Sequence, residues 1–168
     1  MLNAKHKSQG ITLIELLVTL AVMAIISGIG LPSYNAIVNE TKLIGLTQQL
    51  VEALRVTKQL AITRDKTQYL SVNMVGPERC WGISSQPVCN CSVSSSCALE
   101  NYQISTDYST ITLNTNRDTL SFSPLSGSTN GASYTLSAGS GSVKVTVSTL
   151  GRIRACSETG GSTLYANC

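Results

Sequence analysis

The chain has 168 residues, of which 42% are hydrophobic and 12% are charged, and its formal net charge is +3. A charge this small does not indicate that the protein as a whole binds nucleic acid, so any such site must be a local basic cluster. The only histidine is His6, close to the N-terminus, and the sequence has no Gly-rich phosphate loop and no HExxH motif. The rest of the chain therefore cannot form a histidine-based catalytic triad or use a histidine as a general base. We expect a protein that is not an enzyme and has no cofactor.

An apolar run of 21 residues, 11–31, dominates the N-terminal part of the chain. As a helix it would be roughly 31 Å long, about the thickness of one hydrocarbon core. Lys5 and Lys7 precede it, which predicts that the N-terminus stays in the cytoplasm and that the rest crosses the membrane. A cleaved secretory signal fits less well, because its apolar region is typically about 7–15 residues long. We expect a single membrane pass.

Glu15 is the only charged residue in this run, and a carboxylate at mid-bilayer depth costs several kcal/mol. One interpretation is that Glu15 lies one turn inside the membrane and reaches back to the interface. The other is that it meets a positive partner when helices of neighbouring subunits pack together. A free α-amino group, exposed by cleavage between Gly10 and Ile11, would be such a partner.

The residues around this acid form a known kind of motif. Gly10 to Glu15, with the sequence Gly-Ile-Thr-Leu-Ile-Glu, resembles the class III signal of type IV pilins and type II secretion pseudopilins. The resemblance implies that a prepilin peptidase removes residues 1–10, that Ile11 becomes the methylated N-terminus, and that Glu15 guides assembly into a helical filament. Ile11 stands where phenylalanine is the commoner first residue. Loss of the two leader lysines would leave 10 basic and 9 acidic side chains, so the processed chain would be nearly neutral.

A second helical pattern follows Pro32 and continues to about Lys66. Apolar residues recur every three or four positions and give one apolar face, at Leu43, Leu46, Leu50, Ala53, Leu54, Leu60 and Ala61. Proline removes one backbone donor, so we expect a bend near residue 32. The prediction is one long helix, membrane-spanning over 11–31 and amphipathic over 32–66, against which a domain can pack.

The rest of the chain contains segments in which apolar and polar residues alternate, as they do in β-strands. This alternation predicts sheets with one buried face, which would cover the amphipathic helix. The predicted strands are 69–75, 102–105, 110–113, 119–122, 133–136, 142–147 and 152–156. Two segments are predicted to be loops: 84–98, rich in Ser and Cys, and 125–142, rich in Gly and Ser and interrupted by one short strand.

The whole layout is similar to that of the GspH/FimT family of minor pilins, which has a prepilin start, a long helix and a β-rich head. The resemblance implies an α+β fold of the type IV pilin kind, with a long N-terminal helix packed against an antiparallel head. It divides the chain into a leader (1–10), a transmembrane and assembly helix (11–31), an amphipathic helix (32–66) and the head (67–168). It also implies a subunit held in the inner membrane with a periplasmic head, which then joins a pilus at the cell surface.

Six cysteines lie in the head, as expected for disulfides in a translocated domain: Cys80, Cys89, Cys91, Cys97, Cys156 and Cys168. Six cysteines allow 15 pairings, and the sequence does not choose among them. The resemblance favours Cys156–Cys168, a bond that closes the C-terminal tail as in many pilins. Cys89 and Cys91 are too close in sequence to favour a bond with each other, so each would bond outward while the 80–97 cluster staples its own loop. A metal site is the rival interpretation, but the Cys-Asn-Cys spacing lacks the two-residue gap of common zinc motifs, and we expect no metal.

Residues 143–156 have the pattern of a β-hairpin that turns near 149–151. Strand alternation places Arg152 and Arg154 on one face, and Lys144 can join them from the partner strand. Two guanidiniums on a rigid hairpin could bind phosphates in bidentate fashion, with Gly151 removing bulk at the turn. The alternative is that both arginines are ordinary solvated surface residues.

The segment Gly151-Arg152-Ile153-Arg154 also resembles the GRxR motif of FimT-type minor pilins, which is associated with DNA binding during natural transformation. The resemblance therefore implies that the DNA phosphate backbone is bound, without reading of the bases, through Lys144, Gly151, Arg152 and Arg154. Because only Tyr165 lies near the motif in sequence, no stacking platform for single strands is evident.

Two other functions remain open at this point. The protein could be a structural minor pilin that primes pilus assembly, or a type II secretion pseudopilin whose head contacts an exported protein. Lys42, Lys58 and Lys66 on the helix are weaker candidates for the basic patch. The partners that the resemblance implies are other pilin subunits, the prepilin peptidase, DNA and, before assembly, inner-membrane lipid.

Overall fold

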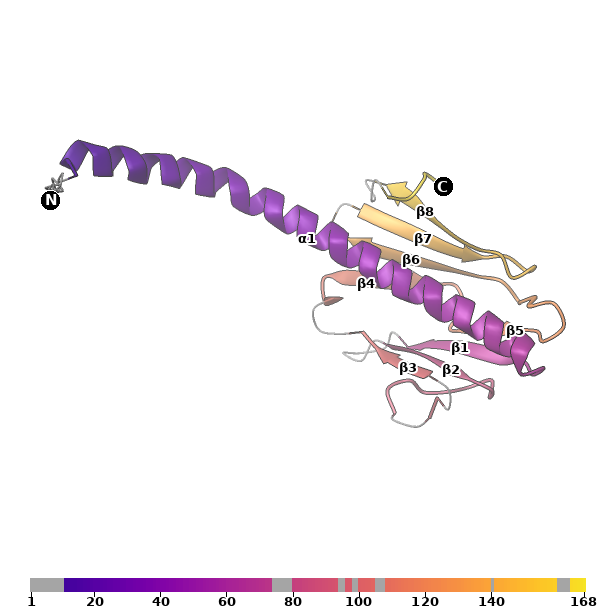
Figure 1. Cartoon of the computed structure of the whole chain (residues 1–168). Helices are drawn as coiled ribbons and strands as arrows, with labels where there is room; N and C mark the ends of the chain where they lie inside the picture. The colour runs from indigo at the N-terminus through magenta and orange to yellow at the C-terminus, as the bar shows by residue number, and fades with distance from the viewer. Residues whose placement is uncertain are drawn as a thin grey trace, which may run out of the picture. The chain divides into compact units, whose positions relative to one another are not determined.

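The computed structural model describes residues 11–73, 80–93, 96–97, 100–104, 108–139, 141–159 and 164–168, and at 29–33, 100–103 and 159 it describes the backbone alone. The predicted leader, 1–10, lies outside the described residues. The chain divides into two compact units, Met1–Ile37 and Val38–Cys168. The helix α1 (Leu13–Thr63) contributes to both units (Figure 1). The strands of the second unit are β1 (Gln68–Asn73), β2 (Cys80–Ser84), β3 (Glu100–Gln103), β4 (Ile111–Thr115), β5 (Thr119–Phe122), β6 (Ala132–Ala138), β7 (Gly141–Val147) and β8 (Ile153–Thr159).

Thr12 caps the N-terminus of α1. The Glu15 amide donates to the Thr12 hydroxyl at 3.4 Å, and the Leu16 amide donates to the Thr12 carbonyl at 3.2 Å. A threonine followed three residues later by a glutamate has the sequence of a capping box, in which the carboxylate adds to the cap. Glu15 therefore stands at the position from which a side chain of this motif can bond back to the start of the helix.

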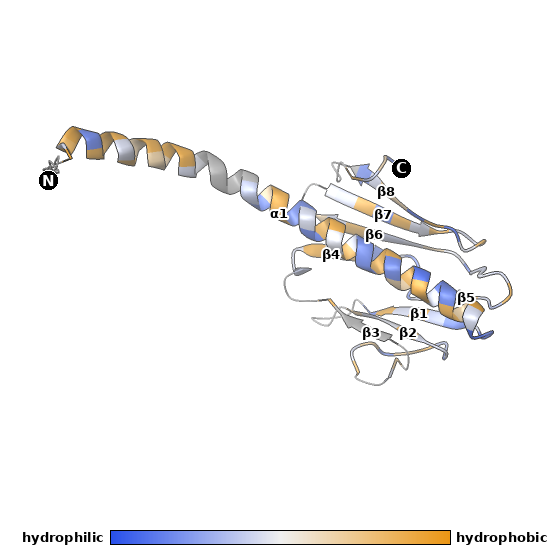
Figure 2. Ribbon diagram, in the orientation of Figure 1, coloured by the Kyte–Doolittle hydropathy of each residue, from blue (hydrophilic) through white to orange (hydrophobic). Residues whose placement is uncertain are grey.

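The first unit exposes the large apolar side chains of α1. From Leu13 to Ile26 every large apolar side chain is at least 48% exposed within this unit. Figure 2 shows this part of the helix as mostly hydrophobic, interrupted near its start. A helix that is apolar on all sides requires lipid or other helices around it. Across the described residues, no helix is both long enough and apolar enough to cross a membrane.

The helix continues without interruption through Pro32 and ends at Thr63 rather than near the predicted Lys66. Asp65 adopts a left-handed conformation with a φ of 49°, and the Lys66 amide donates to the Ala61 carbonyl at 3.3 Å. Because a residue at positive φ cannot continue a right-handed helix, Asp65 closes the C-terminus. The bend expected near residue 32 stays a prediction.

The predicted apolar face of the second half of α1 is confirmed. Its buried members are Leu43, Leu46, Leu50, Ala53, Leu54 and Ala61, and Leu60 packs at its margin. Two threonines are buried on the same part of the helix, and their hydroxyls donate to backbone carbonyls four residues earlier. The Thr47 hydroxyl donates to Leu43 at 2.7 Å and the Thr57 hydroxyl to Ala53 at 2.6 Å, so neither polar group is left unpaired.

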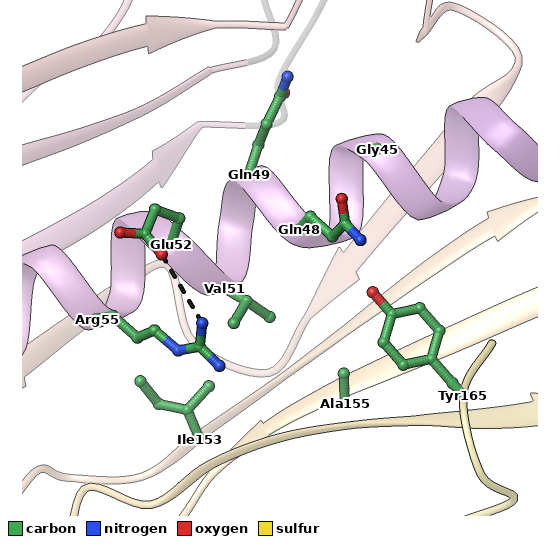
Figure 3. Close-up of a pocket in the computed structure, with 9 residues that line it drawn as sticks. All are labelled: Gly45, Gln48, Gln49, Val51, Glu52, Arg55, Ile153, Ala155 and Tyr165. Atoms are coloured by element: carbon green, nitrogen blue, oxygen red, sulfur yellow. Dashed lines mark ion pairs between the residues drawn. The ribbon is translucent and has the colours of Figure 1, made fainter.

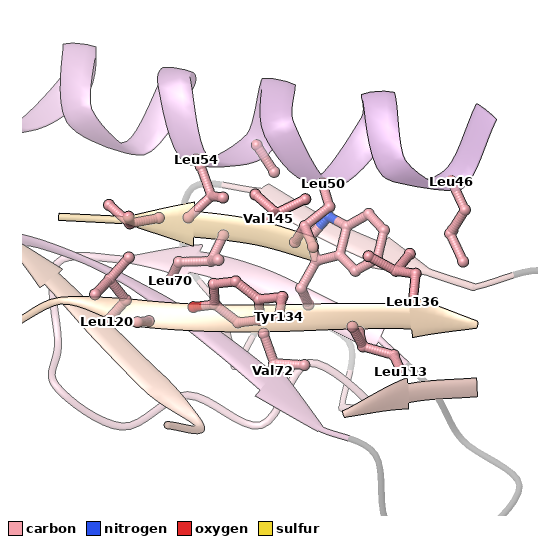
Figure 4. Close-up of a cluster of buried hydrophobic side chains, with 14 of the residues drawn as sticks. Leu46, Leu50, Leu54, Leu70, Val72, Leu113, Leu120, Tyr134, Leu136 and Val145 are labelled. Carbon is pink, nitrogen blue, oxygen red and sulfur yellow. The ribbon is translucent and has the colours of Figure 1, made fainter. Parts of the chain in front are cut away.

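The strands form two antiparallel sheets, one in the order β3-β2-β1-β5 and the other in the order β4-β6-β7-β8. Both sheets contribute to a single hydrophobic core with α1, which includes Leu50 from the helix, Leu70 from β1 and Val145 from β7. Figure 4 shows these side chains meeting between the helix and the strands. The prediction of an α+β fold, with a helix packed against an antiparallel β-rich head, is confirmed.

The strand β2 was not predicted, because its five residues are all buried and show no alternation. Trp81 and Ile83 belong to the main core. On the other face of the strand, a Cβ on Gly82 would collide with the Cys97 sulfur, so the stapled loop packs directly against the backbone there. The short strand predicted at 133–136 is the seven-residue β6, and much of the predicted loop 125–142 is therefore strand.

The six cysteines form three disulfides, which are Cys80–Cys91, Cys89–Cys97 and Cys156–Cys168. The last is the bond that the family resemblance implies, and it ties the C-terminal residue to β8. The other two staple the segment that follows β2, and in both of them the closely spaced cysteines bond outward. No cysteine is free to act as a thiolate ligand.

Tyr134, from β6, is fully buried, and its hydroxyl has no hydrogen-bond partner among the described residues. Burial raises the pKa of the Tyr134 phenol, so the folded protein keeps it protonated at pH values where the unfolded chain ionises, above about 10. The stability linked to this group is therefore fully present below about pH 10 and is lost as the pH rises further.

We expect Tyr134→Phe to raise the free energy of unfolding by about 1 kcal/mol at neutral pH, because the variant no longer buries an unpartnered hydroxyl. Above about pH 10 the variant should lose stability less steeply than the wild type. Denaturant unfolding at neutral and alkaline pH measures both effects. A clear loss of stability at neutral pH would contradict the prediction.

Candidate nucleic-acid interface

The predicted hairpin is formed by β7 and β8. The two strands are antiparallel, and next to the turn Thr146 lies opposite Arg154 and Val147 opposite Ile153. The turn between them is closed by three hydrogen bonds. The Ser148 amide donates to the Arg152 carbonyl at 3.0 Å, the Gly151 amide donates to the Ser148 carbonyl at 2.8 Å, and the Arg152 amide donates to the Ser148 hydroxyl at 3.1 Å. The backbone that carries Arg152 is therefore held on both sides.

The two arginines are exposed, and the residue between them is not. The side chains of Arg152 and Arg154 face the solvent, whereas that of Ile153 is half-buried and packs against the main core. Arg152 lies in the turn rather than in the strand predicted over 152–156, because β8 begins at Ile153. Neither guanidinium has an ion pair in the part of the chain that the structure describes. Both positive charges thus remain available to a ligand.

Lys144 does not join this pair as an unpaired cation. Its ammonium donates to a Glu158 carboxylate oxygen at 2.8 Å, and both side chains are about one-third exposed, at 35% and 33%. Lys144 lies opposite Cys156, and Glu158 lies two residues further along β8, where the register of the two strands shifts. Glu158 is 14 residues from Lys144 in the sequence, and the sheet brings the two together.

Gly151 has a second constraint besides the turn. Its φ is 71°, a left-handed conformation that glycine adopts readily. In addition, a Cβ at this position would collide with the carbonyl oxygen of Gly127, in the turn that follows β5. The glycine of the motif is therefore required by the close approach of the two turns.

A groove of about 760 Å³ runs between α1 and the edge strand β8 (Figure 3). Arg55 of α1 and Ile153 of β8 lie at one end of it, and Tyr165 of the C-terminal tail lies at the other. The lining residues are Gly45, Gln48, Gln49, Val51, Glu52, Arg55, Ile153, Ala155 and Tyr165. Arg55 makes a long ion pair with Glu52 at 3.8 Å, and both side chains are about two-thirds exposed, so the pair contributes little to stability. A third guanidinium thus lies near the hairpin.

Of the three lysines predicted as weaker candidates for the basic patch, Lys58 is bonded to the hairpin turn. Its ammonium donates to the Gly151 carbonyl at 3.0 Å. Sequence reasoning did not find this contact, although there was a signal for it. Lys58 follows Leu54 by four residues and Thr57 by one, so it lies beside the buried face of the helix.

The residues predicted to act in cleavage, methylation and assembly lie near the N-terminus. Ile11 and Glu15 are exposed in the first unit, and Gly10 lies outside the described residues. Within the described residues, no group of three His, Cys, Asp or Glu side chains gathers as around a metal ion.

Two family models match the chain. Residues 46–151, which include most of the head and the last third of α1, match the model described as type II transport protein GspH. The chain belongs to the GspH family. Residues 5–31 match the model of the prokaryotic N-terminal methylation motif, which bears on prepilin processing and on assembly with other subunits. The sequence-based identification as a GspH/FimT-like pilin is thereby confirmed.

The solved structures that resemble this GspH-family chain are those of a minor pilin. A crystal structure of the type IV minor pilin FimU of Pseudomonas aeruginosa PAO1 has a TM-score of 0.53 and 14% identity, and the match covers 68% of this chain and 87% of that one. A second crystal form of FimU has a TM-score of 0.51 and 15% identity, with 67% and 91% covered. At this identity the likeness shows the fold alone, which is the type IV pilin fold. No curated protein sequence matches the chain.

Proposed function

We propose that this pilin-like protein is a minor type IV pilin that joins the pilus and binds extracellular DNA, through the β7–β8 hairpin, for uptake in natural transformation. The observation that carries this proposal is the pair of exposed arginines, Arg152 and Arg154, with no acidic partner among the described residues. A turn with three internal hydrogen bonds holds the backbone of the first of them, so little backbone freedom is lost when a phosphate binds.

The chemistry is capture of the phosphate backbone. Guanidinium groups donate two parallel hydrogen bonds to phosphate oxygens, and such contacts position a protein on DNA without reading the sequence. Arg55 is exposed near Ile153 and can extend the basic surface across the groove, whereas Lys144 is already paired with Glu158. Two or three phosphate contacts imply weak binding that is sensitive to salt.

We further propose that a prepilin peptidase cleaves the chain between Gly10 and Ile11 and that Ile11 is then methylated. Before assembly, the apolar part of α1 holds the subunit in the inner membrane with its head in the periplasm. The match of residues 5–31 to the methylation motif supports the processing, and the exposed apolar side chains from Leu13 to Ile26 support an apolar surrounding. In the filament the same side chains would pack against the helices of neighbouring subunits.

One observation favours a second candidate. The family model that matches most of the head bears the description of a type II transport protein, which favours a secretion pseudopilin whose head contacts an exported protein. A structural minor pilin that primes assembly is the third. Deleting the protein and measuring transformation, twitching and secretion distinguishes these three roles.

The direct test is a titration of the full-length chain, in neutral detergent, with labelled duplex DNA of random sequence at several salt concentrations. We expect binding whose logarithmic affinity falls with the logarithm of salt with a slope of about −2, since roughly 0.9 counterions are released per phosphate contacted. Duplexes of different sequence should bind equally well. Absence of binding at low salt would reject the DNA role and leave the roles of secretion pseudopilin and structural minor pilin.

A further inference from the structure

Lys58 occupies an unusual position for a helix lysine near a DNA-binding surface. It is half-buried, and its ammonium points at a backbone carbonyl of the hairpin turn, Gly151, at 3.0 Å. The contact joins residues 93 positions apart in the chain. It therefore links α1 directly to the turn that carries Arg152.

The aliphatic part of Lys58 is packed against a second turn. A Cβ on Gly127 would lie 2.5 Å from the Lys58 Cε and 3.0 Å from its Cγ, so the stem runs along the Gly127 backbone. Gly127 has a φ of 62°, and its amide donates to the Ser123 carbonyl at 2.9 Å. The side chain of Lys58 thus contacts two glycines, each in a left-handed conformation and each in a different turn.

The two turns also contact each other. The Thr129 amide donates to the Thr149 carbonyl at 2.9 Å, and the Gly127 carbonyl lies where a side chain on Gly151 would have to be. The 123–129 turn, the 148–152 turn and the helix therefore form one contact, and the ammonium of Lys58 is bonded to the second of these turns. We call this contact the Lys58 latch.

We propose that Lys58 is a positioning residue for the hairpin arginines: it fixes the turn from behind, so that Arg152 is presented to phosphate in one orientation. This inference rests on the proposed DNA function. It gives Lys58 a role different from that of Arg152 and Arg154, because its ammonium is bonded to the Gly151 carbonyl and its stem is packed against Gly127, so that it acts on the turn and not on the phosphate. Losing the latch would leave both arginines in place but would free the turn that orders them.

The test compares Lys58→Met with Lys66→Met in the full-length chain in neutral detergent. Methionine retains an unbranched stem against the glycines but cannot donate to Gly151, whereas Lys66 is exposed and its loss removes the same charge. We expect Lys58→Met to weaken binding of duplex DNA about tenfold, because the turn must now be ordered on binding. Lys66→Met should weaken it less than twofold. Equal effects of the two substitutions would overturn the proposal.

The salt dependence separates positioning from direct contact. If Lys58 only positions the turn, Lys58→Met lowers affinity without changing the slope against salt. A slope that becomes shallower by about 0.9 would mean that Lys58 itself binds a phosphate, which would also overturn the proposal.

Amide hydrogen exchange, measured without DNA, tests the Lys58 latch independently of the proposed DNA binding. Amide hydrogen exchange at Thr129, Gly151 and Arg152 should be faster in Lys58→Met than in Lys66→Met. Unchanged exchange would reject the latch even if DNA binds. Faster exchange in a protein that binds no DNA would support the latch and reject only the proposed function.

A glycine variant covers the case in which Lys58→Met does not fold. Gly127→Ala would push the Lys58 stem away without changing any charge, and Gly139→Ala is its matched control. Gly139 has a similar φ of 59°, but a Cβ there would meet no atom within 4 Å. We expect Gly127→Ala, and not Gly139→Ala, to weaken DNA binding and to speed exchange at Arg152. Equal behaviour of the two variants would contradict the latch.

Discussion

Replacing both Arg152 and Arg154 by glutamate should lower the affinity for duplex DNA by roughly a hundredfold or more and leave the protein folded. Each guanidinium can form charge-assisted hydrogen bonds to phosphate worth about 1.5–3 kcal/mol, and glutamate adds repulsion. Both side chains are exposed, so the core does not depend on them. Fluorescence anisotropy with labelled duplex DNA measures the affinity, and far-UV circular dichroism checks the fold.

The matched control is the double variant Arg64→Glu and Lys66→Glu. It changes the net charge by the same amount, at two exposed positions just after α1. If long-range charge alone decided binding, the two double variants would bind DNA equally weakly. Wild-type affinity in the variant at Arg152 and Arg154 would reject the hairpin as the DNA site, and binding would then have to be located elsewhere.

The second large effect is expected at Glu15. Glu15→Ala should still be inserted in the membrane and cleaved, yet should be nearly absent from filaments, because it lacks the carboxylate that we expect to pair with the Ile11 amine of a neighbouring subunit. Immunoblots of membrane and sheared-filament fractions measure the distribution. Incorporation equal to the wild type would contradict the pairing.

The structure supplies a sharper version of this experiment. Because Thr12 caps α1 with Glu15 at the third helical position, alanine removes both the charge and any contribution to the cap. Glu15→Gln retains a side chain that can accept the capping hydrogen bond but has no charge. We expect Glu15→Gln to fail in assembly as Glu15→Ala does. If only the alanine variant failed, the role of Glu15 would be to start the helix, and the ion pair with the neighbouring subunit would be rejected.

Much of the fold could be predicted from local patterns. The leucines at 43, 46 and 50 repeat with the helical period, and they are buried as that period requires. The alternation of β4 and β5 likewise identified strands whose one face is in the core. β2 escaped detection because Trp81 and Ile83 face the core while Gly82 faces a disulfide loop, so that no alternation remains. A strand covered on both faces carries no local signal that separates it from a loop rich in small residues.

The candidate site was predictable only in part, because some of its contacts join residues that are distant in the sequence. The exposed arginines and the turn at Gly151 followed from the spacing within a hairpin, where contacts are local. The Lys144–Glu158 pair depends on the paired register of two strands, and sequence distance alone suggested that the acid was remote. The disulfide partners of Cys80 and Cys89 depend on how a loop folds over β2, which the cysteine spacing leaves open.

The sequence by itself determined that this is a pilin-like chain with a prepilin start, one long helix and a β-rich head. It could do so because a cleavage motif, helical periodicity and strand alternation each depend on residues that are close together in the sequence. Only the tertiary structure decided which basic side chains are free and which are engaged. Lys144 is neutralised by Glu158, Lys58 is bonded to Gly151, and Arg152 and Arg154 have no acidic partner among the described residues. Whether a charge is available depends on partners that the sheets and the helix bring together from distant parts of the chain, and local periodicity carries no information about them.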